Sequence, residues 1–348
     1  MIPRSERLKR LVVSLNRRLG PWLAIGGGIA TALLWRKGID AVRASFVLAS
    51  LFAAVTLLAL FPPWGDARPT EGRGALLHGA AWWTAVNLAQ GALWFVLPFY
   101  VVSTTWLSWN APFTLLLSAL AVVSCFDVFM RDRVLGHGHV AAAFMAPAAF
   151  AALQLFLPVL TSVPPRLTCF AAGALAAAAG AWLVLPGRVG RVGRVGRAGR
   201  VRAAATLLGA AVAGAGLARA ALPWIAPAPL RLASGTFALG RQELDPVDPV
   251  RTLPAGDGRH AFVFVAVEAP RGLVETVHLS VEGAGEREGR PLAIAGGRKG
   301  GYRLWAEVSP TSPGRVRATV VTEGGQIVGR VEAPAEAAGR PEARAGGR

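Results

Sequence analysis

Long apolar runs separated by short polar segments occupy the first 227 residues of the chain. A transmembrane helix needs about 20 apolar residues to cross a hydrocarbon core of about 30 Å. The runs therefore predict an α-helical transmembrane bundle over residues 19–227, preceded by a basic cytoplasmic tail over residues 1–18. About seven spans are expected, namely Leu19–Trp35, Ala44–Pro62, Ala81–Trp106, Pro112–Met130, Val140–Leu160, Thr168–Leu185 and Ala203–Ala226.

After Pro227 the apolar residues recur at every second position, and glycines and prolines interrupt the pattern. This alternation is typical of antiparallel strands with one buried face. Val277, Leu279 and Val281, for example, are separated by His278 and Ser280. We therefore expect strands, and not further membrane helices, in this part of the chain.

The strands of this second region predict a small all-β, immunoglobulin-like sandwich over residues 228–333. The nearly continuous apolar segment His260–Glu268 is expected at the centre of a sheet. Gly324 and Gly325 predict a two-residue hairpin turn into the strand Gln326–Ala333, because glycine accepts the positive φ that such turns need. Residues 334–348 are rich in Pro, Gly, Ala and charge, and predict a disordered tail.

Composition agrees with a membrane protein, since 53% of the 348 residues are hydrophobic and only 16% are charged. The net charge of +17 is concentrated in the helical region, where residues 1–227 hold 21 Lys and Arg against 6 Asp and Glu. These basic residues lie mostly in short segments between apolar runs, where they set membrane orientation. We therefore expect the lipid bilayer, and not nucleic acid, as the partner of this region.

The distribution of the basic residues predicts the orientation. With seven spans and a cytoplasmic N-terminus, 16 Lys and Arg fall on the inner side, including the tract at 187–202, and 4 on the outer side. If the short first span did not cross, the same count would be 10 on each side, which the positive-inside rule does not favour. The β domain is therefore expected outside the cytoplasm. Many tryptophans also fall near predicted span ends, where aromatic belts lie.

Polar residues inside the spans are the places where a transport pathway would lie. Thr84, Asn87 and Gln90 recur at helical spacing and form a candidate polar face in the third span. Hydrogen bonding between helices is the alternative role for such residues. In the last span, small residues including Gly209, Gly214 and Ala218 predict close packing against a neighbouring helix.

The chemistry expected of an enzyme is not indicated by the sequence. Cys125 and Cys169 fall at opposite ends of their spans, and no Cys-x-x-Cys motif is present. His137 and His139 have no third metal ligand near them in the sequence. We therefore expect neither a catalytic site nor a metal site nor a cofactor.

One candidate ligand-binding site lies in the β region, at a glycine-rich basic hairpin. Backbone amides of glycine turns can bind anions, and basic side chains would add charge. In the alternative interpretation the glycines only shape a turn, the arginines are solvated and the tryptophan covers a sheet face. The candidate residues, with the histidine expected on an adjacent strand, are His278, Arg298, Lys299, Arg303 and Trp305.

Several short segments carry a resemblance to a known family. They are Ala269–Leu273, His278, Gly296–Arg298, Gly301–Trp305, Thr322–Arg330, Leu93–Phe99 and Thr104–Trp106. With them the chain resembles an uncharacterised bacterial membrane protein family that joins a multi-spanning N-terminal half to a C-terminal β domain of unknown function. The resemblance implies a multi-pass protein of the bacterial cytoplasmic (inner) membrane and no established activity.

Two functional interpretations follow from these patterns. The first is a non-enzymatic envelope module whose external β domain binds another envelope protein or an anionic envelope component. The alternative is a transporter or channel with the β domain as an accessory.

Overall fold

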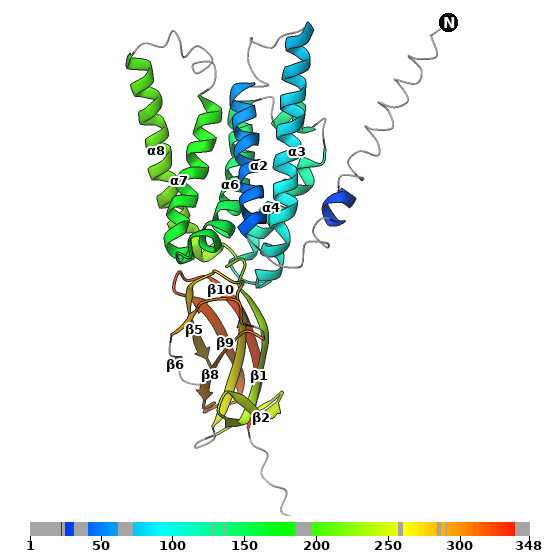
Figure 1. Ribbon diagram of the computed structural model, residues 1–348. Coiled ribbons are helices and arrows are strands. Elements are labelled where there is room, and N and C mark those ends of the chain that lie inside the picture. Colours follow the sequence, from blue (N-terminus) through cyan, green and yellow to red (C-terminus); the bar gives the residue numbers. More distant parts are fainter. Residues whose placement is uncertain are drawn as a thin grey trace, which may run out of the picture. The chain divides into compact units, whose positions relative to one another are not determined.

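The computed structural model divides into two compact units, which are described separately. The first contains Met1–Val101 and Pro112–Leu222, and the second contains Val102–Ala111 and Pro223–Arg348. Among the described residues, the first unit is helical and every strand belongs to the second (Figure 1). The structure describes residues 22, 25–30, 41–61, 72–126, 129–134, 137–185, 197–256, 260–283, 287–289, 291–298 and 300–337.

The helical unit is built from long apolar helices. Five of the described helices, α2, α3, α6, α7 and α8, are long and apolar enough to cross a membrane. The bounds are α2 Ala41–Leu60, α3 Gly72–Ser103, α4 Ala111–Ser124, the π-helical turn η1 Met130–Val134, α6 Gly138–Thr161, α7 Pro165–Val184, α8 Arg197–Ala221 and the short 3₁₀ helix η2 Leu222–Trp224.

These helices confirm the helical class but not the full number of predicted spans. The predicted span Pro112–Met130 corresponds to α4, whose regular helix has only 14 residues. The predicted first span lies mostly outside the described residues, which include Trp22 and the helical residues 25–30. The basic tail and the first part of the arginine tract, residues 187–196, also lie outside them.

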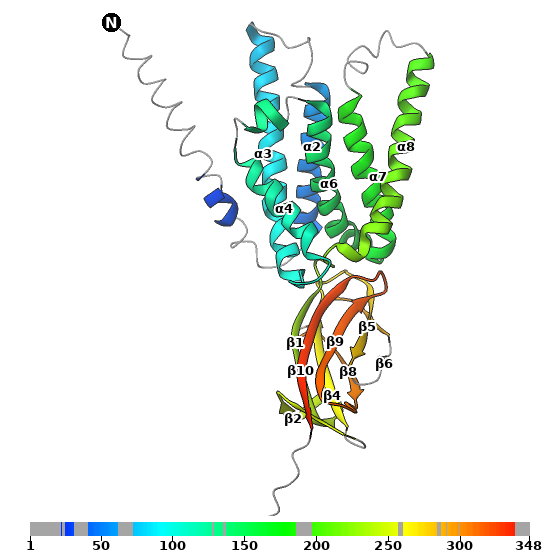
Figure 2. The ribbon, with the colours of Figure 1, turned by 180° about the vertical axis from the view of Figure 1, so that it is seen from behind.

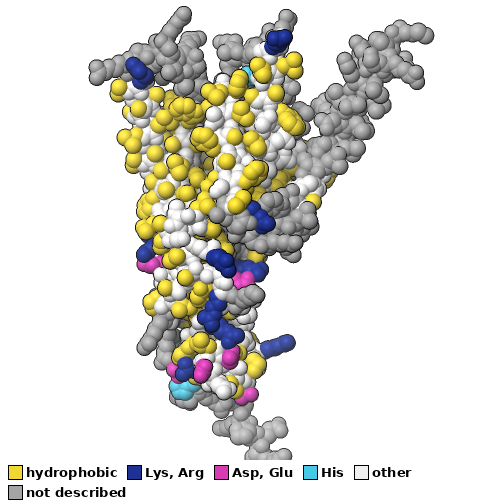
Figure 3. Space-filling model, viewed as in Figure 1, with side chains coloured by type: hydrophobic (Ala, Val, Ile, Leu, Met, Phe, Trp, Pro, Cys, Tyr) yellow, Lys and Arg dark blue, Asp and Glu magenta, His cyan; other side chains and the backbone are white. Residues whose placement is uncertain are grey.

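Helices α6, α7 and α8 pack side by side in chain order, as both ribbon views show (Figure 2). The predicted close packing of the last span is confirmed, because Gly214 of α8 lies against Gly173 of α7. Away from this contact α8 is apolar and exposed, with Leu208, Val212 and Leu217 at its surface. Hydrophobic side chains cover much of this unit on the side that Figure 3 shows, as expected for helices that face lipid.

The β unit consists of two sheets, one with the strand order β2-β1-β4-β8 and the other with the order β3-β10-β9-β5-β6, in which β7 also pairs with β5. Neighbouring strands are antiparallel except β3 and β10, which are parallel. The strands are β1 Arg231–Gln242, β2 Asp245–Val250, β3 Leu253–Ala255, β4 Ala261–Glu268, β5 Glu275–Glu282, β6 Arg287–Glu288, β7 Leu292–Ile294, β8 Tyr302–Val308, β9 Gly314–Thr322 and β10 Ile327–Ala337.

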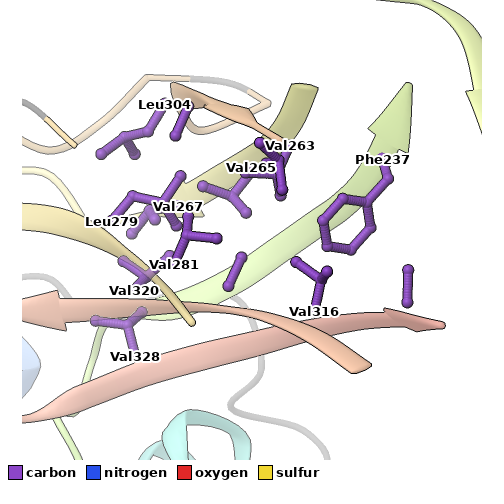
Figure 4. Close-up of a cluster of buried hydrophobic side chains, with 14 of the residues drawn as sticks. Phe237, Val263, Val265, Val267, Leu279, Val281, Leu304, Val316, Val320 and Val328 are labelled. Carbon is purple, nitrogen blue, oxygen red and sulfur yellow. The ribbon is translucent and has the colours of Figure 1, made fainter. Parts of the chain in front are cut away.

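The inward-facing side chains of both sheets form one hydrophobic core (Figure 4). Val263 and Val265 of β4 meet Leu279 of β5 and Val316 and Val320 of β9 in this core, and all are at most 2% exposed. Full burial of one such side chain contributes about 1.5–3 kcal/mol. The period-two alternation predicted from the sequence is thus confirmed, and the expected central strand is β4, which lies between β1 and β8.

The C-terminal boundary and the last turn differ from the sequence prediction. Strand β10 continues to Ala337, because Pro334 and Ala335 pair with β9 and Ala335–Ala337 pairs with β3. The predicted tail therefore does not begin at residue 334, and residues 338–348 lie outside the described residues. Between β9 and β10 only Gly325 has a positive φ, of 84°, so Gly324 and Gly325 do not form the predicted two-residue turn.

Candidate functional site

Strand β8 presents a tryptophan between two charged residues on the outward face of its sheet. Leu304, Ala306 and Val308 point into the core, so Arg303, Trp305 and Glu307 alternate with them and point outward. The register places Trp305 opposite Phe264 of β4. The Trp305 ring also contacts Phe262 edge-on, with 6.0 Å between ring centroids. The outward face of β4 and β8 therefore carries an aromatic cluster.

The tip of the β1–β2 hairpin reaches this aromatic cluster. The guanidinium carbon of Arg241 lies 3.9 Å from the centroid of the Trp305 ring and 5.9 Å from that of Phe262. Asp245, at the start of β2, forms an ion pair with Arg303. We call these five residues, Arg241, Asp245, Phe262, Arg303 and Trp305, the β8 surface.

The interactions that hold the hairpin tip on the β8 surface are weak ones. The side chains of Arg303 and Asp245 are 47% and 69% exposed, and ion pairs this exposed contribute about 0–1 kcal/mol. A cation over an aromatic ring at an exposed site contributes about 0.5–1 kcal/mol. An incoming anionic group can therefore replace the Asp245 carboxylate on Arg303 at little cost in stability.

The predicted ligand-binding residues are only partly brought together. Arg303 and Trp305 share the outward face of β8, as the sequence pattern implies. Arg298 is exposed in the segment before β8, with its guanidinium carbon 5.8 Å from the centroid of the Tyr302 ring. Lys299 lies outside the described residues.

His278 does not lie on a strand adjacent to β8, so that prediction is wrong. It belongs to β5, which pairs with β9, β6 and β7 in the other sheet. Since Val277 and Leu279 fill the core, His278 alternates with them and points outward from the opposite side of the unit. The chain passes from one sheet to the other between β7 and β8, which local alternation does not reveal.

The glycines before β8 have a structural role. Gly296 has a φ of +72°, and a Cβ atom there would lie 2.0 Å from the carbonyl oxygen of Pro270. Gly301 has a φ of +79°, and its Cβ would lie 2.9 Å from the carbonyl oxygen of Val267. This observation favours the interpretation in which these glycines shape a turn.

The other sheet carries an ion-pair network on its outward face. Arg317 of β9 lies between two glutamates, with Nε 2.7 Å from Glu332 Oε1 and Nη1 3.7 Å from Glu282 Oε2. The hydrogen bond from Arg317 lowers the pKa of the Glu332 carboxyl below its ordinary value. The arginine there is therefore matched by carboxylates, whereas Arg241 of the β8 surface lies on an aromatic ring.

The three residues of the candidate polar face of α3 differ in exposure and in their hydrogen bonds. Thr84 and Asn87 are exposed, and the Asn87 side-chain amide donates to the carbonyl of Trp83 in its own helix at 2.8 Å. Gln90 donates to the Cys125 sulfur at 3.3 Å, as the hydrogen-bonding alternative expects. The transporter or channel alternative stays a prediction.

The relation of the chain to known proteins rests on one comparison. Residues 3–254 match the model of a family of unknown function, DUF5924, which covers more than half of the chain. The chain belongs to the DUF5924 family. The matched region contains the helical unit with β1 and β2 and ends within β3, so it excludes β4 and β8. None of the curated proteins compared with this DUF5924 chain matches it.

Sequence reasoning missed a cluster of buried polar residues in this DUF5924 protein. Asn110, which is fully buried, donates from Nδ2 to the carbonyl of Ile327 at 3.0 Å. Gln326, 2% exposed, donates from Nε2 to the carbonyl of Ile225 at 3.0 Å. Asn110 directly precedes α4, so its sequence context indicates a helix cap and conceals this role.

Among the residues that the structure describes, no group of three or more His, Cys, Asp or Glu side chains is placed to hold a metal ion. The β8 surface contains one carboxylate, two arginines and two aromatic rings. This combination suits recognition of an anionic or planar group.

Proposed function

We propose that this DUF5924 protein is a non-enzymatic module of the bacterial cell envelope, in which the helices anchor the chain in the cytoplasmic membrane and the β domain binds another envelope component. The main support for the proposal is that one chain contains five apolar helices long enough to span a membrane and a separate β unit with its own hydrophobic core. A domain with a complete core can present a binding surface without help from the anchor.

The proposed orientation has a cytoplasmic N-terminus and an extracytoplasmic β domain. The 16 Lys and Arg on the inner side against 4 on the outer side support this orientation. The exposed apolar faces of the helices, such as that of α8, support burial in lipid.

The proposed class of the β domain is immunoglobulin-like. In that fold the first, second and fifth strands form part of one sheet and the third, sixth and seventh form the other. The orders β1-β4-β8 and β5-β9-β10 follow this scheme when β2, β3, β6 and β7 are treated as additions and the fourth strand of the scheme is taken as missing. Domains of this architecture commonly serve as cell-surface modules, which supports a binding role by analogy.

The proposed contact is the β8 surface together with Arg298, which is exposed in the segment before β8. Arg303 is held only by an exposed carboxylate, and Arg241 and Arg298 lie against aromatic rings. A partner with anionic groups can engage these arginines through charge-assisted hydrogen bonds, which are about twice as strong as neutral ones. Trp305 and Phe262 supply apolar contact area beside them.

Crosslinking in the native membrane tests this proposal. A photoreactive amino acid is placed at position 242, an exposed glutamine next to Arg241, and, as the control, at position 315, whose arginine is exposed on the other sheet. We expect a discrete crosslinked partner from position 242 only, and its loss when Arg303→Ala is added. Equal capture from both positions, or none from position 242 at low salt, would contradict the proposed surface.

A further inference from the structure

The segment between α3 and α4 belongs to the β unit. Val102–Ala111 forms one compact unit with the chain from Pro223 onward. Within that unit the fully buried Asn110 bonds to the carbonyl of Ile327, at the start of β10. The loop itself is compact, since Ser108 Oγ lies 2.6 Å from both Asn110 Oδ1 and the carbonyl oxygen of Thr105. A buried side-chain hydrogen bond requires that the loop and the β domain lie on the same side of the membrane.

This shared side restricts how often the chain can cross between Ala111 and Leu222. Two points on one side of a membrane are joined by an even number of crossings. Helices α6, α7 and α8, with 24, 20 and 25 residues, supply three. An even number therefore requires one more. Given the membrane location proposed above, we infer that Ala111–Val134 makes this fourth crossing, although its regular helix is too short to count as a span.

The length of the segment permits this crossing. The 14 residues of α4 extend over about 21 Å at 1.5 Å per residue, and a hydrocarbon core is about 30 Å thick. The remaining distance of about 9 Å is close to what the described residues after α4 can cover, among them the π-helical turn η1. Met130 and Val134 of that turn are 1% and 5% exposed, so it packs within the helical unit.

The polar side chains of α4 fit an apolar environment. Ser118 Oγ donates to the carbonyl of Thr114 at 2.8 Å, and Ser124 Oγ donates to the carbonyl of Ala121 at 2.6 Å. Hydroxyl groups bonded to their own helix carry no unpaired donor into a membrane.

The two segments that flank the crossing region belong to the β unit and carry exposed aromatic residues. Trp106, Trp109 and Trp224 are 52%, 74% and 60% exposed, and Leu107 is 99% exposed. Tryptophans concentrate at membrane interfaces. The loop and the end of α8 thus have the composition expected at one and the same interface.

Cysteine labelling of the full chain in intact cells tests the inference. In a Cys125→Ser, Cys169→Ala background, single cysteines replace the exposed residues Leu107, His137, Ser162, Ala198 and Thr311. With a membrane-impermeant maleimide we expect Leu107→Cys, Ser162→Cys and Thr311→Cys to react from one side. His137→Cys and Ala198→Cys should react only after permeabilisation, and His139→Cys repeats the decisive position in case one variant fails to fold.

Each possible result has a distinct meaning. Reaction of His137→Cys and His139→Cys on the same side as Leu107→Cys would show that α4 does not cross, and would overturn the inference. Reaction of Leu107→Cys and Thr311→Cys from opposite sides would overturn it as well. If His137→Cys and Ala198→Cys reacted in intact cells and the other three variants only after permeabilisation, the result would support the crossing and contradict only the proposed orientation. Release of the protein from membranes by alkaline carbonate would instead contradict the proposed membrane anchor.

Discussion

Gly173 of α7 and Gly214 of α8 lie in direct backbone contact. A Cβ atom on Gly173 would stand 2.3 Å from the carbonyl oxygen of Gly214, and one on Gly214 would stand 2.4 Å from that of Gly173. The relation is reciprocal, so neither position can accept a side chain without moving a helix. Small residues at helix interfaces allow this approach in membranes.

Substitution of either glycine should therefore separate the two helices. We expect Gly173→Ala or Gly214→Ala to destabilise the protein by about 1–3 kcal/mol, as overpacking does. Gly209→Ala and Gly216→Ala are matched controls on α8, because nothing lies within 4 Å of a Cβ at either position. Unfolding in detergent measures the difference, and equal midpoints for all four variants would contradict the contact.

Asn110 should contribute more to stability than an exposed asparagine. Asn110→Ala leaves the carbonyl of Ile327 without its side-chain partner, and loss of such a buried bond costs about 1–3 kcal/mol. Asn87→Ala is the control, because Asn87 is exposed and bonds only within its own helix. Melting curves of the two variants should differ, and a neutral Asn110→Ala variant would mean that the loop is not held by β10.

The glycines before β8 should differ in their tolerance of a methyl group. Gly296 and Gly300 both have positive φ, of +72° and +78°, so alanine at either position costs roughly 1–2 kcal/mol in backbone strain. Only at Gly296 would the methyl group also collide with a carbonyl oxygen. Gly296→Ala should therefore lower the melting temperature clearly more than Gly300→Ala, and the reverse order would contradict the turn geometry.

The Arg317–Glu332 pair should make the stability of the β domain depend on pH. Because Arg317 lowers the pKa of Glu332 in the folded state, the pair stabilises the fold fully above the unfolded carboxyl pKa of about 4.3. This contribution is lost as the pH falls through the lower pKa of the folded protein. Glu332→Gln should therefore melt slightly below the wild type at pH 7 and together with it at a pH well below 4.3. Glu336→Gln, at an exposed position of the same strand, should match the wild type at both values.

The boundaries of the β domain can be tested with two fragments. A fragment of residues 223–337 keeps the pairing of β10 with β3 and the bond from Gln326 to Ile225. A fragment of residues 230–333 removes both. We expect the longer fragment to give a β-type circular dichroism spectrum and a higher melting temperature, independent of reductant because the segment contains no cysteine. Equal stability would show that these contacts add nothing.

The sequence by itself determined the two classes of structure and most of the core. Contact with lipid or with a protein core requires apolar side chains, so the long apolar runs predicted α2, α3, α6, α7 and α8. In the same way, alternation predicted the inward positions of β5, β8 and β9. The small residues of the last span predicted close packing against another helix, because only small side chains let two helix backbones approach each other as α7 and α8 do.

Only the tertiary structure decided which distant segments meet. The alternation of β5 and β8 is the same whether they share a sheet or not, so it could not place His278 and Trp305 in different sheets. Likewise, nothing in the local sequence of Asn110 specifies Ile327, which follows it by 217 residues. Strand pairing and buried hydrogen bonds depend on the whole packed domain, because each partner is chosen by the space and the unpaired groups that the other segments leave.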